Sequence, residues 1–255
     1  MPLAIDLSHK IALITGGSGD LGRVITRTLA DAGATVAIHF HRNAEKAHEL
    51  CGAVQAGGGR AFAVQADVTD ADSVQAMREA VVAAVGAPDI IVNTAVIQYQ
   101  WEHVLSQPIE DFESQFRSCV LHNVIMAQTF VPAMIERGWG RVIALNTECS
   151  FACKPLQSAY VSGKRGMDGM LRVLAREVGP HGITVNQVAP GWIITDRDRA
   201  RGMERQPDYE MEVPLRRRGE EKDIAHAIAF LASDLAGFIT GAVLPVCGGH
   251  EIPTI

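Results

Sequence analysis

The fold of this chain is decided by the stretch Ile11–Gly22, which reads IALITGGSGDLG. Its first part, Ile11–Thr15, is a short aliphatic run bounded by a turn signal, and such a run predicts a buried strand. The glycines that follow lead directly into a helical pattern over Leu21–Ala32. Glycines at a strand-to-helix turn let the backbone come close to a pyrophosphate at the positive N-terminus of the helix. The stretch therefore predicts a dinucleotide-binding turn.

Short strand patterns and longer helical patterns alternate along the rest of the sequence. Strands are predicted at Ile11–Thr15, Thr35–Phe40, Ala61–Ala66, Ile90–Asn93, Arg141–Leu145, Thr184–Ala189 and Ala242–Val246. Helices are predicted at Leu21–Ala32, Ala44–Ala56, Ala71–Val85, Ile109–Glu136, Ser158–Val178 and Lys222–Ala232. Elements that alternate in this way form a parallel sheet covered by helices on both faces. Because no linker or repeat interrupts the pattern, we expect an α/β fold with a single domain over residues 1–255.

Composition excludes several classes of protein. Of the 255 residues, 47% are hydrophobic and 20% are charged, which is ordinary for a soluble globular protein. The net charge of −6 gives no electrostatic reason to expect a nucleic-acid or anionic-membrane partner. No apolar run suggests a membrane span, and residues 1–10 lack the core of a signal peptide. The five scattered cysteines predict free thiols in a reducing cytoplasm.

The sequence contains two small clusters of potential metal ligands. Cys149 and Cys153 lie four residues apart, but no histidine or second cysteine pair completes a zinc pattern. His39 and His41 point the same way at a predicted strand end, but two ligands without a carboxylate make a poor site. We therefore expect no metal, and interpret these histidines as packing at the edge of the cofactor site.

Tyr160 and Lys164 lie four residues apart in the predicted helix Ser158–Val178, so they share one face. A tyrosine with a pKa of about 10 is a poor acid–base catalyst at neutral pH. A nearby ammonium group favours the phenolate and lowers that pKa. The same spacing also fits a surface tyrosine beside a solvated lysine, and only the rest of the sequence can decide between the two interpretations.

Six segments favour the catalytic interpretation of Tyr160 and Lys164, because they occur in the same order as the motifs of a known family. They are the glycine loop, Asp67-Val68, Asn93-Thr94-Ala95, Tyr160 with Lys164, Pro190-Gly191 and Gly248-Gly249. On these residues the chain resembles the short-chain dehydrogenase/reductase family over nearly its whole length. The resemblance implies a doubly wound Rossmann-type sheet of about seven strands and hydride transfer between a nicotinamide and a small carbonyl/alcohol substrate. It also implies a homo-oligomer, a tetramer or a dimer.

The resemblance assigns catalytic roles to four residues. Tyr160 would be the acid/base, and Lys164 would lower its pKa and hold the nicotinamide ribose. Thr147 falls where the family usually has serine, and its hydroxyl can still polarise a substrate carbonyl. Counting back from Pro132 puts Cys119 where the family has its catalytic asparagine, although a thiol is a weaker hydrogen-bonding group.

The resemblance also implies a cofactor site at the strand ends. Asp67 and Val68 would hold the adenine, and Asn93 and Ala95 the adjoining ribose. Ile193 and Thr195 would meet the carboxamide. With Tyr160 and Lys164, the full set implied is Gly16, Ser18, Gly19, Leu21, Gly22, His41, Arg42, Asp67, Val68, Asn93, Ala95, Pro190, Ile193 and Thr195.

Charge at the end of the second strand favours NADP(H) over NAD(H). Selectivity for NAD usually places an acid there to bond the ribose 2′-hydroxyl. Here Phe40 is followed by His41 and Arg42, so no carboxylate opposes a 2′-phosphate and Arg42 can bond one. Against this, Arg42 could simply begin a solvated helix, and Gly19 stands where many NADP users carry a base. An NAD-dependent dehydrogenase of the same mechanism is the second possibility.

Four positions depart from the family pattern: Asp20, Val96, Cys119 and Cys247. A carboxylate at Asp20 would repel a pyrophosphate unless it points to solvent. The changes leave room for a different class of protein, a low-activity cofactor-binding regulatory or scaffold protein with the same fold. Intact Tyr160, Lys164 and Thr147 oppose that alternative.

The substrate pocket is implied by resemblance to lie between Ile97–Trp101, Glu148–Phe151 and Trp192. Gln98 and Glu148 would be polar contacts for the substrate, and Trp192 an apolar or stacking surface. Each of the three fits a role in packing equally well. The long stretch 192–218 predicts an irregular segment that could act as a substrate lid. Its last residues, Arg216–Arg218, could attract an anionic substrate, but we predict that they are solvated because charge runs usually are.

Overall fold

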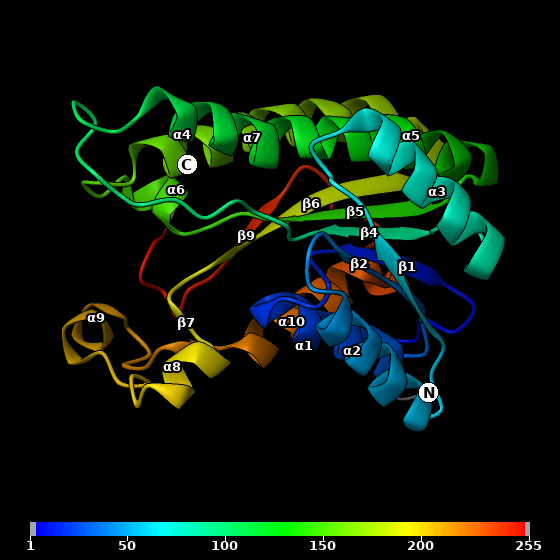
Figure 1. Cartoon of the computed structure of the whole chain (residues 1–255), viewed down its shortest axis with the longest axis horizontal. Coiled ribbons are helices and arrows are strands. Elements are labelled where there is room, and N and C mark those ends of the chain that lie inside the picture. Colours follow the sequence, from blue (N-terminus) through cyan, green and yellow to red (C-terminus); the bar gives the residue numbers. More distant parts are fainter. Residues whose placement is uncertain (1–3, 253–255) are drawn as a thin grey trace.

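The computed structural model describes residues 4–252, and seven parallel strands form its central sheet (Figure 1). The strand order is β3-β2-β1-β4-β5-β6-β9, so the chain moves outward from β1 in one direction and then in the other. The strands are β1 (Ile11–Thr15), β2 (Thr35–Phe40), β3 (Ala61–Gln65), β4 (Ile90–Asn93), β5 (Gly140–Leu145), β6 (Ile183–Pro190) and β9 (Val243–Val246). The predicted doubly wound α/β fold is confirmed.

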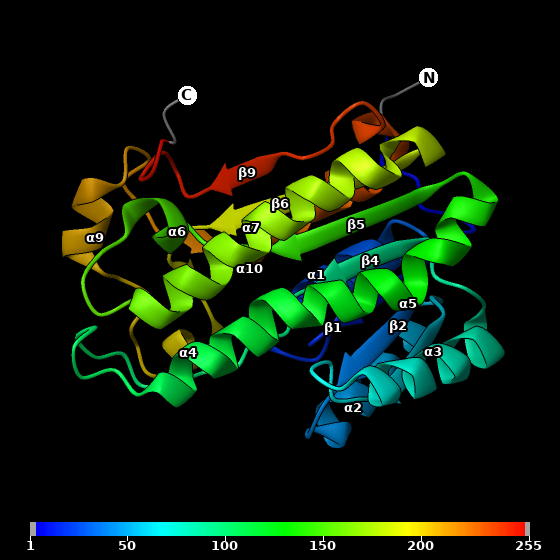
Figure 2. The same cartoon turned by 90° about the horizontal axis from the view of Figure 1, so that it is seen from above.

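Helices cover both faces of this sheet (Figures 1 and 2). One layer holds α1 (Asp20–Asp31), α2 (Ala44–Ala56) and α10 (Glu221–Ala232), and the other holds α3 (Ala71–Val85), α5 (His122–Arg137) and α7 (Ser158–Val178). Strand side chains alternate between the layers, because successive residues of a strand point to opposite faces. In β2, Val36, Ile38 and Phe40 pack toward α1 and α2, whereas Ala37 packs toward α3.

One predicted helix is divided in the structure. The sequence predicts a single helix over Ile109–Glu136, but α4 (Ile109–Gln115) and α5 are joined by a π-helical segment, Phe116–Leu121. Such segments are rare and are frequent at functional sites. Cys119 lies in this segment, and its backbone carbonyl accepts a hydrogen bond from Asn123 Nδ2 at 2.8 Å. Apolar periodicity did not reveal the change, because helical residues continue on both sides.

The sequence predicts no apolar run that could span a membrane, and the same helical stretch shows that this is wrong. Ile109–Arg137 is long and apolar enough to cross a membrane when judged by length and composition alone. Half of its most apolar window is buried inside the protein, however. Met126, Phe130 and Met134 are almost fully buried against the sheet and α7. A core helix meets the same criteria, so the apolar residues are explained by packing.

The segment 192–218 is more regular than predicted. It contains the two-residue strand β7 (Ile193–Ile194), which pairs with β8 (Gly219–Glu220), and the short helices α8 (Asp196–Ala200) and α9 (Pro207–Glu212). Figure 1 shows these elements at the end of the sheet where the strand arrows point. The segment is therefore an ordered subdomain placed over the carboxyl ends of the strands.

Arg218 was predicted to be solvated, and this is wrong. Its side chain is fully buried and donates hydrogen bonds to the carbonyls of Ile193 (2.9 Å) and Met203 (2.8 Å). It also forms an ion pair with Asp198 at 2.9 Å. A guanidinium group has five donors in a fixed fork, which suits it to several carbonyls at once. Arg218 thus ties the middle of α8 and the loop after it to the strand β7.

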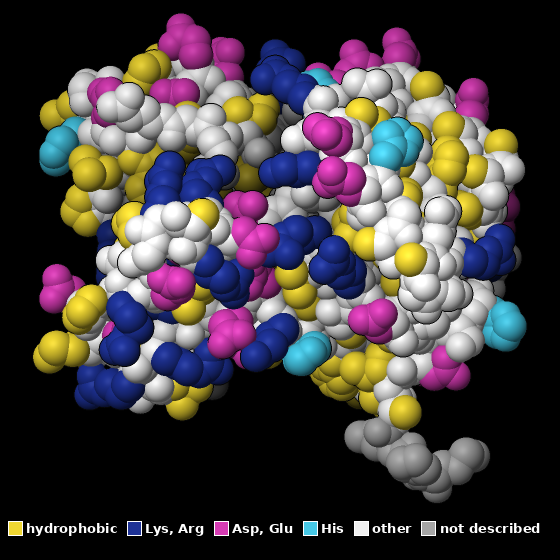
Figure 3. All heavy atoms as spheres, turned by 60° about the horizontal axis from the view of Figure 1, so that its bottom comes forward, with side chains coloured by type: hydrophobic (Ala, Val, Ile, Leu, Met, Phe, Trp, Pro, Cys, Tyr) yellow, Lys and Arg dark blue, Asp and Glu magenta, His cyan; other side chains and the backbone are white. Residues whose placement is uncertain are grey.

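Ion pairs attach this subdomain to the first helix layer. Arg23 of α1 lies 2.6 Å from Asp196, and Arg199 of α8 lies 2.7 Å from Glu221 at the start of α10. Figure 3 shows basic and acidic side chains intermixed on this face. The mixture means that this face presents no uniform charge to a polyanionic partner.

Candidate active site

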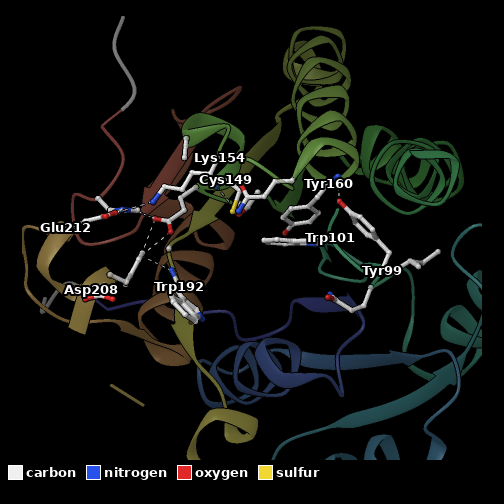
Figure 4. Close-up of a pocket in the computed structure, with 17 residues that line it drawn as sticks. Tyr99, Trp101, Cys149, Lys154, Tyr160, Trp192, Asp208 and Glu212 are labelled. Carbon is white, nitrogen blue, oxygen red and sulfur yellow. Dashed lines mark hydrogen bonds and ion pairs between the residues drawn. The ribbon is translucent and has the colours of Figure 1, made fainter. Parts of the chain in front are cut away.

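A cavity of about 630 Å³ opens where β4, β5 and β6 end (Figure 4). In open α/β sheets, ligands bind outside the carboxyl ends of the strands where the strand order reverses. The wall comes from the loops after these strands, from α7, from α9 and from the C-terminal segment. Among its residues are Gln98, Tyr99, Trp101, Thr147, Glu148, Cys149, Gln157, Tyr160, Trp192, Tyr209 and His250.

The glycine loop has the backbone that the sequence predicts. Gly16 has a φ of 63°, a left-handed conformation that favours glycine. A β-carbon at Gly22 would lie 2.1 Å from the carbonyl oxygen of Gly16, so only glycine fits there. Ser18, Gly19 and Leu21 complete the turn into α1. This tight turn ends at a helix N-terminus and fits a pyrophosphate.

His39 is part of this turn, which the sequence did not reveal. The amide of Gly16 donates to His39 Nδ1 at 3.0 Å, so His39 Nε2 carries the proton and donates to the carbonyl of Ala66 at 3.0 Å. Burial lowers the pKa of His39 to about 4, and the ring is therefore neutral. It joins the glycine loop to the end of β3. No group of three potential metal ligands gathers anywhere in residues 4–252.

Asp20 lies at the first position of α1 with an exposed side chain. A carboxylate in the first turn of a helix interacts favourably with the helix dipole. Because the side chain faces solvent, it does not fill the turn formed by Gly16 and Gly22. The departure at Asp20 is thus compatible with a bound pyrophosphate.

The predicted adenine and ribose residues line the next strand ends. Asp67 accepts a hydrogen bond from the hydroxyl of Thr69 at 2.7 Å, and this bond lowers the pKa of Asp67. Val68 is buried beside it. Asn93 is buried and donates to Asn123 Oδ1 at 2.7 Å, whereas its own Oδ1 has no hydrogen-bond partner among the described residues. A buried acceptor of this kind fits a ligand that brings a donor.

The end of β2 combines one buried residue with two exposed ones. Phe40 is buried, whereas His41 and Arg42 are exposed. His41 Nε2 lies 4.0 Å from Asp67 Oδ2, so both face the same side of the strand ends. Arg42 forms no ion pair within residues 4–252 and is available to a ligand.

Two aromatic residues hold Tyr160 in the cavity. The resemblance assigned them only to the wall of the substrate pocket. The hydroxyl of Tyr99 accepts a hydrogen bond from the backbone amide of Tyr160 at 2.7 Å. The indole of Trp101 stacks on the phenol ring, with centroids 6.0 Å apart and planes 26° apart (Figure 4). Burial raises the pKa of Tyr160 above its usual value, and the Thr147 hydroxyl acts in the opposite direction.

Lys164 lies one turn after Tyr160 on α7 and is buried. Its Nζ donates to the carbonyl of Leu145 at 2.5 Å and lies 5.8 Å from the centroid of the Tyr160 ring. Burial lowers the pKa of this lysine. The expected lowering of the Tyr160 pKa by Lys164 is therefore not seen in this arrangement, because burial of the phenol dominates.

Thr147 lines the cavity, whereas Cys119 lies in the π-helical segment between α4 and α5. Thr147 follows β5, where its Oγ1 accepts a hydrogen bond from the amide of Cys149 at 3.2 Å. Cys119 is almost fully buried, and its Sγ lies 4.0 Å from Gln115 Oε1. All five cysteines are free thiols, as predicted.

Of the residues that follow β6, Trp192 lines the cavity, whereas Ile193 and Thr195 serve in packing and helix capping. Pro190 ends the strand, and the exposed indole of Trp192 meets Tyr209 edge-on with centroids 5.5 Å apart. Ile193 is buried. Thr195 caps α8 in a capping box with Asp198, so its hydroxyl already has a partner.

Glu148 belongs to a network that sequence reasoning missed. His250 Nδ1 lies 3.0 Å from Glu148 Oε2, and His250 Nε2 lies 3.1 Å from Glu212 Oε2. Tyr209 donates its hydroxyl proton to Glu148 at 3.1 Å. Lys154 pairs with Glu212 at 3.2 Å. Burial alone would lower the pKa of His250, but its bonds to Glu212 and Glu148 outweigh this and raise it.

Comparison with known proteins identifies the family. The family described as enoyl-(acyl carrier protein) reductase matches residues 18–251. The 3-oxoacyl-(acyl carrier protein) reductase FabG of Staphylococcus aureus is 36% identical over 250 residues, covering 94% of this chain and 97% of that protein. The chain belongs to the short-chain dehydrogenase/reductase family.

Another protein and two solved structures are also similar to this chain over nearly its whole length. Nodulation protein G of Azospirillum brasilense is 34% identical over 253 residues, with 95% and 98% of the two chains covered. A gluconate 5-dehydrogenase from Burkholderia cenocepacia, solved with NADP and tartrate, has a TM-score of 0.88 and 30% identity, with 96% of each chain covered. A short-chain dehydrogenase/reductase variant from Serratia marcescens has a TM-score of 0.88 and 30% identity, with 96% and 99% covered.

Membership of this family decides between the two classes left open by the sequence. The protein is an NAD(P)(H)-dependent oxidoreductase that transfers hydride between a nicotinamide and a carbonyl/alcohol substrate. A regulatory or scaffold role with little turnover is not favoured. The cavity that contains Tyr160 and Thr147 agrees with an enzyme.

Proposed function

We propose that this protein is an NADP(H)-preferring reductase or dehydrogenase of small carbonyl/alcohol substrates, with Tyr160 as the acid/base. One observation carries the proposal: Tyr160 and Thr147 line the same cavity, and Lys164 is buried one turn from Tyr160. This brings a proton donor, a second hydroxyl and a cation to the carboxyl ends of the strands.

Each of these residues has a task in the reduction. When bound, the nicotinamide supplies the hydride that reaches the carbonyl carbon. The Tyr160 hydroxyl donates its proton to the carbonyl oxygen, and Thr147 holds that oxygen by a hydrogen bond. The Lys164 ammonium stabilises the phenolate that Tyr160 becomes. Cys119 lies in the position of the proton-relay asparagine but has weaker hydrogen-bonding capacity.

Preference for NADP(H) rests on the end of β2. Arg42 is exposed there, and no carboxylate of residues 40–42 opposes a 2′-phosphate. The 2′-phosphate is the only difference between the two cofactors, so a charge-assisted bond from Arg42 would act on NADP(H) alone. The Burkholderia cenocepacia relative, solved with NADP, supports the same choice.

The test is titration of the purified protein with NADPH and NADH, followed by nicotinamide fluorescence. We expect tighter binding of NADPH, and an Arg42→Ala variant that loses affinity for NADPH much more than for NADH. Arg176→Ala, on the exposed last turn of α7, is the matched control and should change neither. Equal losses for both cofactors in Arg42→Ala would contradict the preference. Binding of neither cofactor to the wild type would contradict the function itself.

We also propose that the enzyme works as a homo-oligomer in the cytoplasm. Phe116 of the π-helical segment is half exposed and lines a surface depression together with Leu121 and Gly163. Apolar surface of this kind favours association through the helices that carry Cys119 and Tyr160. Light scattering on the purified protein should give the mass of a dimer or a tetramer, and a monomer mass would contradict the proposal.

A further inference from the structure

The cavity presents hydrogen-bond acceptors to whatever fills it. Glu148 is 7% exposed and lines the cavity just after Thr147. Its carboxylate accepts hydrogen bonds from Tyr209 at 3.1 Å and from His250 at 3.0 Å. An ionised carboxylate has about four acceptor sites, so these bonds leave it able to accept more.

A second acceptor in the same wall comes from Gln157, at the start of α7. Gln157 is 9% exposed and lines the cavity, and its Oε1 has no hydrogen-bond partner within residues 4–252. Its side chain does not cap the helix. Buried amide oxygens are nearly always hydrogen-bonded in folded proteins. The Oε1 atom is itself buried, so it accepts from a substrate donor once the Gln157 side chain turns toward the cavity.

The cations of the wall are already paired. Lys154 is bound to Glu212 at 3.2 Å. Both nitrogens of His250 face carboxylates, those of Glu148 and Glu212, and the ring can donate to both only as imidazolium. Asp208 adds a further carboxylate that has no ion pair in the described chain. Three carboxylates of the wall thus face two cations of the wall, while the buried Lys164 adds a third cation beside Tyr160. The end of the cavity that holds Glu148 therefore disfavours an added negative charge.

We infer that the substrate carries a hydrogen-bond donor, a hydroxyl or an ammonium group, which binds Glu148 and Gln157 while its carbonyl faces Tyr160. Substrates with an acid group at that end are rejected. This inference rests on the proposed function and narrows its substrate class. Glu148 and Gln157 are then specificity-determining residues, because they meet the part of the substrate that does not react.

The test uses four ketones of one shape: cyclohexanone, and cyclohexanones that carry a hydroxyl, an ammonium or a carboxylate group opposite the carbonyl. The quantity compared is kcat/KM with NADPH for each, divided by the value for plain cyclohexanone. We expect the hydroxyl and ammonium compounds to exceed plain cyclohexanone about tenfold, and the carboxylate to fall about tenfold below it, because a site built for a donor discriminates by roughly this much or more. Dividing by the plain ketone removes general losses of activity.

Two variants assign the effect to residues. Glu148→Gln keeps an acceptor but removes the charge, so the penalty on the carboxylate and the preference for the ammonium should both shrink. Gln157→Met should reduce the preference for the hydroxyl compound. Glu177→Gln, exposed on α7 and outside the cavity, is the control and should leave all ratios unchanged.

The failures of the inference and of the proposed function are distinguishable. Equal ratios for the four ketones, or the highest ratio for the carboxylate, would overturn the inference and leave the reductase standing. If none of the four is reduced, the ranking is measured as protection of Tyr160→Phe from thermal unfolding in the presence of NADPH. Absence of protection by the hydroxyl and ammonium compounds would then overturn the inference. The cofactor titration above decides the proposed function separately.

Discussion

The hydroxyl of Tyr99 accepts a hydrogen bond from the backbone amide of Tyr160 at 2.7 Å, although the two residues are 61 positions apart in the sequence. The amide belongs to the first turn of α7, whose N–H groups have no partner inside the helix. The neighbouring Gln157 side chain does not cap this helix. Tyr99 therefore acts as a cap from the loop after β4 and fixes the position of the proposed acid/base.

Removing this cap by Tyr99→Phe should lower kcat by roughly three- to tenfold, because the phenol of Tyr160 loses its fixed position. The free energy of unfolding should fall by about 1 kcal/mol, since one helix amide loses its acceptor. Steady-state kinetics and thermal unfolding measure the two effects. An unchanged kcat together with lower stability would show that Tyr99 supports only the helix.

Replacing the acid/base by Tyr160→Phe should lower kcat by about 10²- to 10⁴-fold, because no hydroxyl remains to donate the proton. Cofactor binding, followed by nicotinamide fluorescence, should weaken far less than kcat falls, since only one of the implied cofactor contacts is lost and the ring still stacks on Trp101. Turnover that survives within tenfold of the wild type would rule out Tyr160 as the acid/base.

Restoring the amide by Cys119→Asn should raise kcat by about tenfold, because an asparagine offers two donors and an acceptor where the thiol is weak at both. Gln115 Oε1, now 4.0 Å from the sulfur, is close enough to orient the new amide. Cys119→Ala serves as the control and should bring no gain. If both variants match an already active wild type, another residue or a water molecule fills the relay.

Removing the buried guanidinium by Arg218→Met should destabilise the 192–218 subdomain by about 3 kcal/mol, because the carbonyls of Ile193 and Met203 lose their donor. Limited proteolysis should then cut within residues 196–212 first. Arg217→Met removes a half-exposed pair with Asp223 and should cost at most about 1 kcal/mol. Equal protease resistance in the two variants would contradict the role of Arg218.

The His250 network should make stability depend on pH. The pKa of His250 is raised in the folded protein, so its contribution is complete below the unfolded pKa of about 6.5 and is lost as the pH rises through the folded value. The groups facing it are Glu148, Glu212, Tyr209 and Lys154. The difference in Tm between wild type and His250→Gln should be largest at about pH 6 and should shrink toward about pH 9. A Tm difference that grows as the pH rises would contradict a protonated His250 in the folded protein.

Most of the fold was predictable because it is encoded locally. The aliphatic run Ile11–Thr15 and the glycines after it specify a strand, a tight turn and a helix within a dozen residues. The predicted bounds of β1, β2, β4, α2, α3 and α7 match the structure. Tyr160 and Lys164 share a helix face because the helical period brings residues four apart together.

The tertiary structure decided what depends on distant contacts. His250 lies 102 residues from Glu148, and Arg218 lies 25 residues from the carbonyl of Ile193 that it binds. Burial of these polar groups is possible only where loops from different strands supply their partners. The apolar periodicity of one helix or strand does not specify which loops will contact each other. The sequence by itself therefore determined the sheet, the glycine turn and the Tyr160–Lys164 pair, whereas only packing at the strand ends determined the shape and the charge of the substrate cavity.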